Sequence, residues 1–200
     1  GAASAWRSPR RIRRWPRGAR AVVVAFLTVH IAVAALLFPL NATSARFGQK
    51  YIQDAAGQVE AGKEFENQDL VILNHPVAHF AHMFQTVRIL DGRSFPARVR
   101  VLAPAGERLH LFRSGERELL VRPEGGFLQA PFDNVYRGPE HPFGRGEKVE
   151  LTGCTAEIAS LTDDERPAAV LFRFAVPLED ASLRWIAWGA RGYEPFLPPQ

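Results

Sequence analysis

Hydrophobic residues follow three patterns along this 200-residue chain, and each pattern predicts a different kind of structure. From Ala21 to Leu40 twenty consecutive residues carry no formal charge, and as a helix they would span about 30 Å, the thickness of a bilayer's hydrocarbon core. Residues 44–62 place apolar side chains four residues apart, as an amphipathic helix does. Beyond residue 69 the apolar residues come in short runs and alternations, which predict strands.

The first of these runs, Leu70–Leu73, predicts a buried strand. Asn74, His75 and Pro76 then combine a good N-cap with a proline suited to a first helical turn, so a helix is expected over 77–90. Residues 97–103 alternate apolar and charged side chains, as a half-exposed strand should. Strand, helix and strand together predict one βαβ unit.

The remaining sequence predicts a small antiparallel β barrel or sandwich, because short strand-like segments are separated by regular turn signals. Strands are expected at 109–113, 118–122, 127–130, 148–151, 155–160, 168–175 and 183–188, with an extended tail after residue 193. The predicted class is therefore α+β: a transmembrane helix followed by a βαβ unit and a small antiparallel β barrel or sandwich. The predicted parts are a basic cytoplasmic tail (1–20), the transmembrane helix (21–40), an amphipathic helix and linker (41–68), and an extracytoplasmic β-rich domain (69–200).

Charge is concentrated at one end of the chain, and this sets the expected membrane orientation. Residues 1–20 carry seven arginines and no acidic residue, so the positive-inside rule places them in the cytoplasm and residues 41–200 outside it. Pro39 is expected to mark the end of the helix. Arginine outnumbers lysine 22 to 3, a bias typical of GC-rich bacterial genomes. The expected location is thus the bacterial inner membrane, with the C-terminal domain in the periplasm.

Three other interpretations of the apolar segment remain. A cleaved signal peptide usually has a shorter core of 7–15 apolar residues. A core helix that is apolar on every face would need a larger protein around it. The segment could also be the last of several membrane spans.

Composition excludes some classes of function. The body of the protein beyond residue 20 has 18 basic and 21 acidic residues, so it lacks the basic surface that nucleic-acid binding requires. Cys154 is the only cysteine, which excludes an intramolecular disulfide and a thiolate metal cluster. The sequence has no Gly-x-Ser-x-Gly elbow, no phosphate-binding glycine loop and no His-Glu-x-x-His motif. No cofactor is expected.

The only clustered metal-ligand residues are His75, His79 and His82, whose spacing puts them along one face of a helix. Three imidazoles and a water can hold catalytic zinc, so a metal-dependent hydrolase is one alternative function. Three ligands on one straight helix chelate a tetrahedral ion poorly, however, and no carboxylate accompanies them. We therefore predict that these histidines do not form a metal site.

Two further pairs of residues are candidates for ligand binding. Asn74 and His75 lie where a strand ends and a helix begins, the place at which α/β units often bind ligands. A capping role for Asn74 is the simpler explanation. Arg137 and His141 belong to a loop, residues 131–146, that is rich in Pro, Gly and Arg and could either bind a ligand or merely connect strands.

Four stretches of the C-terminal part carry a family resemblance, namely Val121–Phe127, Tyr136–Phe143, Val149–Gly153 and Pro177–Trp185. They resemble the end of a family of uncharacterised polytopic bacterial membrane proteins, and the resemblance covers residues 15–200. It implies that the helix at 21–40 is the last of several spans and that the β domain faces the periplasm. The family pattern has Asn-Ala-Pro-Asp after the first strand, whereas this chain has Asn74-His75-Pro76-Val77, which counts against a shared histidine metal site.

These observations predict a membrane-anchored extracytoplasmic domain that acts as a non-catalytic interaction or structural module of a larger integral membrane protein. Its expected partners are the lipid bilayer and other transmembrane helices of the same protein. Besides the hydrolase, the alternative is an accessory domain of a transporter or of a membrane-embedded transferase.

Overall fold

A computed structural model describes residues 16–59, 62–75, 83–103, 108–129, 133, 137–138, 140–190 and 192–200, without the side chains of 40–51. The chain divides into two compact units, residues 1–50 and 51–200, and each is described by itself.

The first unit is helical. It contains α1 (Arg17–Thr28), a π-helical segment η1 (Val29–Val33) and most of α2 (Ala34–Gln58). The apolar side chains of this helix are exposed on all sides, for example Val22 at 70% and Leu36 at 76%. Residues Arg17–Pro39 are long and apolar enough to cross a membrane. The expected membrane candidate is thus present.

Two residues of this helix, His30 and Pro39, are unusual in an apolar helix, and the helix continues through both. His30 Nδ1 donates to the carbonyl of Phe26 at 3.1 Å and its ring stacks on the Phe26 ring at 4.0 Å, so the helix itself provides a partner for one of the two ring nitrogens. Pro39 lies inside α2, and the prediction that it ends the helix is wrong. A proline removes only one backbone hydrogen bond, and the turns on either side keep theirs; such prolines are tolerated in membrane helices.

The second unit contains two sheets, α3 (Met83–Leu90) and a short 3-10 helix, η2 (Lys63–Asn67). The mixed sheet has the strand order β2 (Arg98–Ala103), β1 (Asp69–Asn74), β8 (Leu183–Gly189) and β9 (Gly192–Pro195). The antiparallel sheet has the order β3 (Leu109–Gly115), β4 (Glu118–Pro123), β7 (Pro167–Phe174), β6 (Cys154–Leu161) and β5 (Lys148–Leu151).

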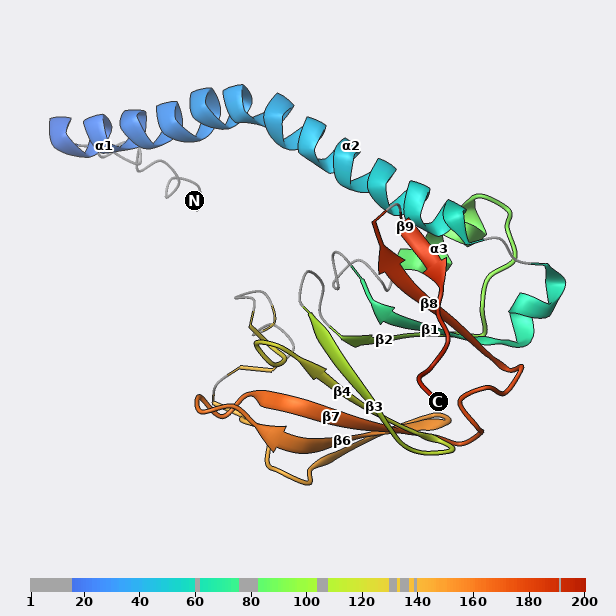
Figure 1. Cartoon of the computed structure of the whole chain (residues 1–200). Helices are drawn as coiled ribbons and strands as arrows, with labels where there is room; N and C mark the ends of the chain where they lie inside the picture. Colours follow the sequence, from blue (N-terminus) through green and yellow to red (C-terminus); the bar gives the residue numbers. More distant parts are fainter. Residues whose placement is uncertain are drawn as a thin grey trace, which may run out of the picture. The chain divides into compact units, whose positions relative to one another are not determined.

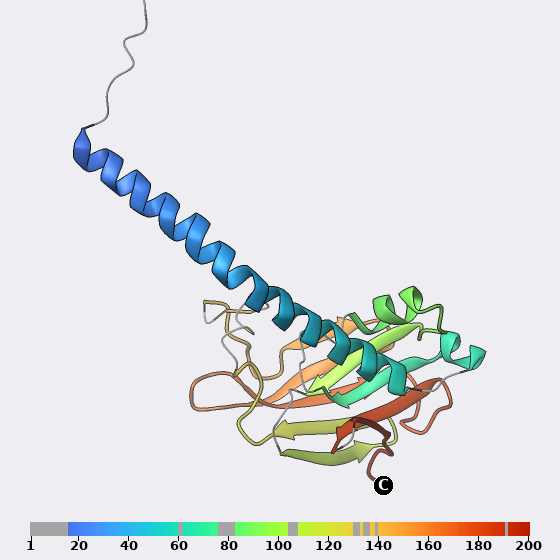
Figure 2. The same cartoon turned by 90° about the horizontal axis from the view of Figure 1, so that it is seen from above.

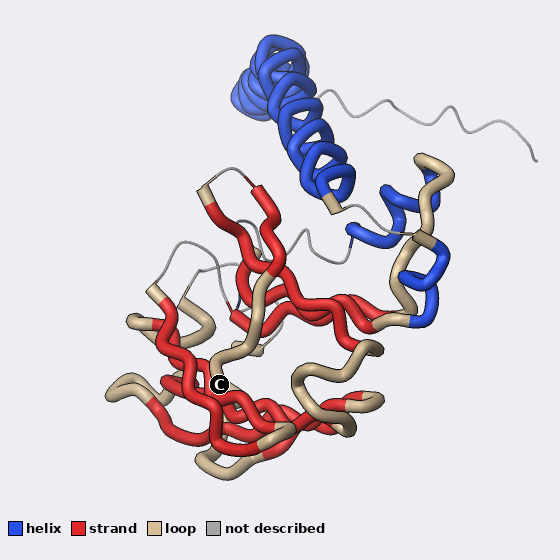
Figure 3. The backbone as a smooth tube through the Cα atoms, turned by 45° about the vertical axis from the view of Figure 1, so that its right-hand side comes forward, coloured by secondary structure: helices blue, strands red, loops and turns tan. Residues whose placement is uncertain are grey.

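The mixed sheet is the middle layer of this unit. Figure 1 shows α3 and the last turns of α2 on one of its sides and the antiparallel sheet on the other, and Figure 2 shows the end of α2 lying over its strands. Because strand side chains alternate between faces, Leu70 and Ile72 pack against the helices whereas Val71 packs against the second sheet. Figure 3 separates the two layers of strands.

Each face of the mixed sheet has its own hydrophobic cluster. The cluster between the sheets includes Val71, Leu119, Phe172 and Trp185. The cluster under the helices joins Ile72 and Ile186 of the sheet to residues Ile52, Ala56, Val59, Phe65, Phe84 and Val87. The end of α2 is therefore part of the core of the second unit.

The α+β class is confirmed, with differences in detail. β1 and β2 are parallel and α3 lies between them in sequence, as the βαβ prediction requires. The described strands form two open sheets, so a closed barrel is wrong. The strand expected at 183–188 leaves the antiparallel part and pairs in parallel with β1, with Leu70 opposite Arg184.

Two local predictions also fail. Residues 127–129 are not in a strand, because Leu128 has φ +58°, a left-handed conformation that a strand excludes. The tail expected from residue 193 is in part a strand, β9, paired antiparallel to β8.

Candidate functional site

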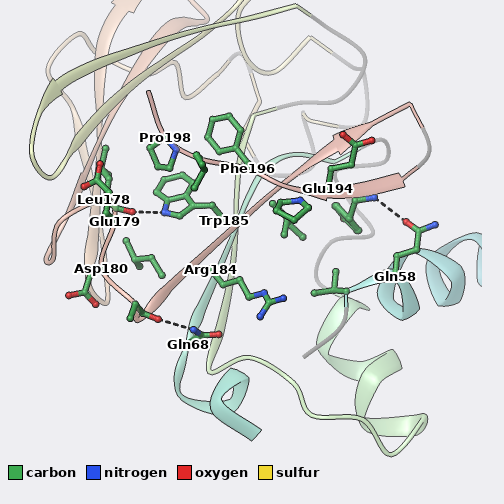
Figure 4. Close-up of a pocket in the computed structure, with 17 residues that line it drawn as sticks. Gln58, Gln68, Leu178, Glu179, Asp180, Arg184, Trp185, Glu194, Phe196 and Pro198 are labelled. Carbon is green, nitrogen blue, oxygen red and sulfur yellow. Dashed lines mark hydrogen bonds between the residues drawn. The ribbon is translucent and has the colours of Figure 1, made fainter. Parts of the chain in front are cut away.

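A cavity of about 620 Å³ in the second unit, larger than the cavity at Arg137 described below, lies beside β8. Its lining comes from β8, from β9 and the tail that follows it, from residues 178–181, and from Gln58, Val59 and Gln68 (Figure 4). Trp185 fixes one wall, because its Nε1 donates to the carbonyl of Leu178 at 2.8 Å and its ring lies between the rings of Phe174 and Phe196. This volume suits a small ligand or a few residues of peptide.

The cavity exists because the last strand covers only part of β8. The pairing of β9 with β8 begins at Ile186, opposite Pro195, and one more hydrogen bond joins Phe196 N to Trp185 O at 3.2 Å. The chain then turns away from β8. Near its end, the carbonyl of Pro199 accepts a hydrogen bond at 3.3 Å from Nη1 of Arg113, a residue of β3 in the antiparallel sheet. Among the described residues, β8 from Leu183 to Trp185 therefore has a strand neighbour, β1, on one side only.

Among the described residues that line this cavity, carboxylates outnumber cations. Glu179 accepts hydrogen bonds from both terminal nitrogens of Arg113, and these bonds lower the pKa of its carboxyl. Asp180 accepts from the Ser182 hydroxyl at 2.6 Å and the Ser182 amide at 2.9 Å, which lower its pKa in the same way. Both are thus ionised at neutral pH, and Glu194 is exposed at the opposite end. Arg184, the cation among the described lining residues, has its guanidinium 5.6 Å from the centre of the Phe65 ring.

One polar group in the wall lacks a hydrogen bond. Gln68 Nε2 donates to the carbonyl of Ala181 at 2.8 Å, which fixes the orientation of the amide. Its Oε1 is buried and has no partner among the described residues.

The end of α2, which forms one end of the cavity, is held by two arginine side chains and by a backbone amide of β9. The last carbonyls of a helix have no partner within the helix. Here Arg88 Nη1 donates to Ala56 O at 2.8 Å and Val59 O at 2.7 Å, and Arg93 Nη1 donates to Gly57 O at 3.0 Å. Gln58 Oε1 in turn accepts from the amide of Tyr193 on β9 at 3.0 Å (Figure 4).

Arg88 is a buried cation, 2% exposed, between the rings of Phe65 and Phe84. Burial lowers its pKa from the usual arginine value, with Arg93 and Arg184 adding to the effect. The negative end of the α2 dipole and three carbonyls compensate the charge.

The second cavity, about 280 Å³, brings together two predicted residues, Arg137 and His141. Arg137 Nε donates to the carbonyl of His141 at 2.6 Å, and its Nη2 donates to Glu147 at 2.9 Å. Its guanidinium also lies 3.8 Å from the centre of the Phe143 ring. These contacts of Arg137 thus hold its own loop in its conformation.

The far wall of this cavity contains a tight ion pair in the β6–β7 turn. Arg166 Nε donates to Asp164 at 2.7 Å, and Thr162 Oγ1 donates to the same carboxylate at 2.6 Å. These two bonds lower the pKa of Asp164 to about 2. Both walls are therefore held by internal bonds.

The other predicted residues lie elsewhere. Asn74 pairs its side-chain amide with the backbone of Trp188, accepting at 2.8 Å and donating at 3.4 Å, so it extends the β1–β8 ladder by one step. His75 is buried, with its ring edge-on to Tyr193 at 5.8 Å. Neither residue lines the two cavities described above.

His79 and His82 lie outside the described residues. Within the part of the chain that the structure describes, no three His, Cys, Asp or Glu side chains are grouped to hold a metal. The absence of a histidine metal site stays a prediction.

Sequence patterns did not reveal the larger cavity, because it depends on where β8 and β9 pair. A weak signal was present in Pro195 and Pro198, which flank apolar residues and disfavour a long final strand. The role of Arg88 was also missed, since a lone arginine in a helical pattern usually faces solvent.

No protein-family model matches the chain, and no curated protein or solved structure matches it either.

Proposed function

We propose that this chain is a membrane-anchored module whose β-rich unit lies in the periplasm of a bacterium and works by interaction rather than catalysis, as part of a larger integral membrane protein. The proposal follows from residue patterns, from the described contacts, and from the family resemblance of residues 15–200.

The observation that carries the proposal is the exposure of the apolar segment Arg17–Pro39 together with the course of α2. The side chains of that segment are exposed on every face. An apolar surface of this size is unfavourable in water, so we expect lipid or other membrane helices to cover it. The same helix α2 that begins in this segment ends in the core of the second unit, where Ala56 and Val59 are buried. An anchor joined to a domain by one continuous helix suits a module that works at a membrane.

The described contacts favour interaction over catalysis. The carboxylates at the larger cavity accept hydrogen bonds from Arg113 and Ser182, and these hold them ionised. A general acid needs the opposite shift, a raised pKa near neutrality. Cys154 is buried and burial raises the pKa of its thiol, which suppresses nucleophilic reactivity.

Cysteine labelling in intact cells tests the anchor and its orientation. A cysteine at Ser114, an exposed residue of β3, should react with an impermeant maleimide, and a cysteine at Ser8 should react only after permeabilisation. The unmodified chain is the matched control, because its Cys154 is buried. Release of the chain by an alkaline carbonate wash, or the reverse labelling pattern, would contradict the proposal.

The arginines themselves can be tested as the cause of the orientation. Replacing Arg10, Arg11, Arg13 and Arg14 by Gln leaves three arginines in residues 1–20 and should produce a mixed population of orientations. The control replaces four arginines far from the anchor in sequence by Gln and should leave the labelling pattern unchanged; these are Arg113, Arg117, Arg122 and Arg137.

A further inference from the structure

We propose that the β-rich unit pairs with a second copy of itself along the outer edge of β5, so that two antiparallel sheets join into one across a two-fold axis at Val149. This inference rests on the proposed interaction function and names one partner, a second copy of this chain.

The backbone of β5 provides the first argument. β5 is the last strand of the antiparallel sheet, and β6 is its one neighbour among the described strands. The amide of Ile158 donates to the carbonyl of Glu147 at 2.9 Å, and these residues stand opposite each other in the β5–β6 register. Peptide groups alternate in direction along a strand, so the N–H and C=O groups of Lys148 and Glu150 point away from β6. An antiparallel partner strand would bond to these outward groups.

Charge selects the partner and the register. Lys148 and Glu150 are two residues apart, so their side chains lie on the same face of the sheet. In an antiparallel pair centred on Val149, Lys148 of each copy lies opposite Glu150 of the other. A pair centred on either charged residue would place like charges opposite each other. Charges on an edge strand usually discourage pairing, but this arrangement of opposite charges favours pairing with a second copy in one register.

Both charged side chains have bonding capacity for a second partner. Lys148 Nζ lies 3.7 Å from Glu157, and the lysine side chain is 53% exposed. Glu150 accepts a hydrogen bond from the Thr155 hydroxyl at 2.8 Å through one carboxylate oxygen. An ammonium group has three donors and a carboxylate has two acceptor oxygens. The contacts within one copy can therefore persist in the dimer.

The other face of β5 is apolar and lies at the rim of the core. Val149 stands opposite Ala156, which stands opposite the buried Phe172. This row leads out of the core to Val149, which is 38% exposed, and Leu151 beside it is 49% exposed. Across the two-fold axis Val149 would meet its own copy in a non-hydrogen-bonded pair, where side chains come closest. A second copy would thus cover apolar surface at the end of the core.

The contact is small, and this decides where it forms. Pairing along the 4 residues of β5 buries much less than the roughly 1,200–2,000 Å² of a stable complex between soluble proteins. Two copies held in one membrane have a high effective concentration, which populates a weak contact. The test therefore uses the full chain in its membrane.

Cysteine cross-linking measures the register. In a Cys154→Ala background, Val149→Cys places two thiols opposite each other at a Cα separation that a disulfide spans. Membranes from bacteria that express the full chain are oxidised briefly with copper phenanthroline, and dimers are measured by non-reducing electrophoresis. Val149→Cys should cross-link at least about tenfold faster than Ser114→Cys, which lies exposed on the opposite edge strand and reports random collisions. Glu150→Cys should also cross-link more slowly, because it lies opposite Lys148 of the second copy.

Charge reversal tests the recognition. Glu150→Lys, added to Val149→Cys, puts a lysine opposite each Lys148 and should slow cross-linking by about tenfold. Glu116→Lys makes the same change in the exposed β3–β4 turn and should leave the rate unchanged. Chains with Lys148→Glu and chains with Glu150→Lys, made in one cell with different tags, should cross-link with each other faster than either does with itself.

Equal rates for Val149→Cys, Ser114→Cys and Glu150→Cys would overturn the inference, and so would an unchanged rate with Glu150→Lys. Either outcome leaves the cysteine-labelling pattern untouched and counts against the dimer alone. Loss of that pattern would count instead against the anchored function.

Discussion

The two sheets of the second unit differ in how far apart in the sequence their paired strands lie. In the antiparallel sheet most neighbours follow each other in sequence, as β3 and β4, β5 and β6, and β6 and β7 do. In the mixed sheet the central strand β1 pairs with β8, so that Asp69 lies opposite Leu183. The first arrangement follows from turns and alternating side chains within short windows of sequence. The second requires segments more than a hundred residues apart to meet, which no local pattern encodes.

The two layers also use arginine differently. On the outer face of the antiparallel sheet, Arg173 forms ion pairs with Glu118 and Glu157 where water reaches all three side chains. Beneath the helices, Arg88 is buried and donates to carbonyls at the end of α2. An exposed ion pair contributes little to stability, whereas a buried donor keeps several carbonyls from being left unpaired.

The largest expected effect comes from removing Arg88. Arg88→Ala leaves the carbonyls of Ala56, Val59 and Ser94 without their donor and should lower the free energy of unfolding by about 3–5 kcal/mol. The melting temperature, followed by tryptophan fluorescence in detergent, should fall by roughly 6–20 °C.

Arg173→Ala is the matched change in the other layer, and it should cost about 1 kcal/mol or less. Arg88→Lys keeps the charge but lacks the planar fork, so its stability should lie between those of the wild type and Arg88→Ala. If the two alanine variants melt at the same temperature, the contrast between the layers fails.

A smaller effect is expected at Gly192, where β9 meets the end of α2. Its φ of +128° is open to glycine alone, and a Cβ there would collide with the Gln58 side chain. Gly192→Ala should therefore lower the free energy of unfolding by about 2 kcal/mol. Gly146 has φ +79° but open space around it, so Gly146→Ala isolates the backbone cost at about 1 kcal/mol.

The collision itself can be separated from the backbone strain. Gln58→Ala removes the colliding side chain, so the double variant Gly192→Ala with Gln58→Ala should lose less stability than the sum of the two single variants. Strict additivity would show that the collision with Gln58 adds nothing to the cost of Gly192→Ala.

What the sequence predicted follows the same division between local and distant structure. Residues 109–122 and 148–175 show strands and turns in short windows, and five described strands lie there close to the expected positions. The apolar run Ala21–Leu40 was equally evident, because the length and composition that make a candidate membrane span can be counted directly in the sequence. Leu183–Trp188 was recognised as a strand, but its partner could not be predicted, since an apolar run fits a parallel and an antiparallel neighbour equally well.

The candidate sites show this limit more sharply. Asn74 bonds the backbone of Trp188 across the sheet, a contact that no local sequence pattern indicates. Arg137 and His141 do lie together because they are four residues apart. The cavity beside β8 needs Gln58, Gln68, Trp185 and Phe196 in one place, which only the tertiary fold provides.

The smallest effect belongs to the β6–β7 turn and concerns pH. The pKa of Asp164 is about 2 in the folded chain and 3.8 without its partners, so the carboxylate stabilises the fold above about pH 4 and loses this contribution as the pH falls toward 2. Asp164→Asn should lower the melting temperature by about 1–2 °C at pH 6 and by clearly less near pH 2, where about half of the Asp164 carboxyl is protonated.

Asp163→Asn removes the same charge from the same turn and is the matched control. It should leave the melting curve close to that of the wild type at both pH values. A constant difference between wild type and Asp164→Asn from pH 6 to pH 2 would exclude the proposed cause.

The late position of β8 in the sequence has a consequence during synthesis. A ribosome adds about 5–20 residues per second, so roughly 5–20 s pass between the translation of β1 and that of its neighbour β8. Through that interval the apolar run Leu70–Leu73 has β2 on one side and an open edge on the other, which is a template for pairing with other nascent chains. The cell must keep the emerging chain apart from its copies until Leu183–Gly189 has been made, and a premature stop codon between β2 and that strand would leave the open edge permanently exposed.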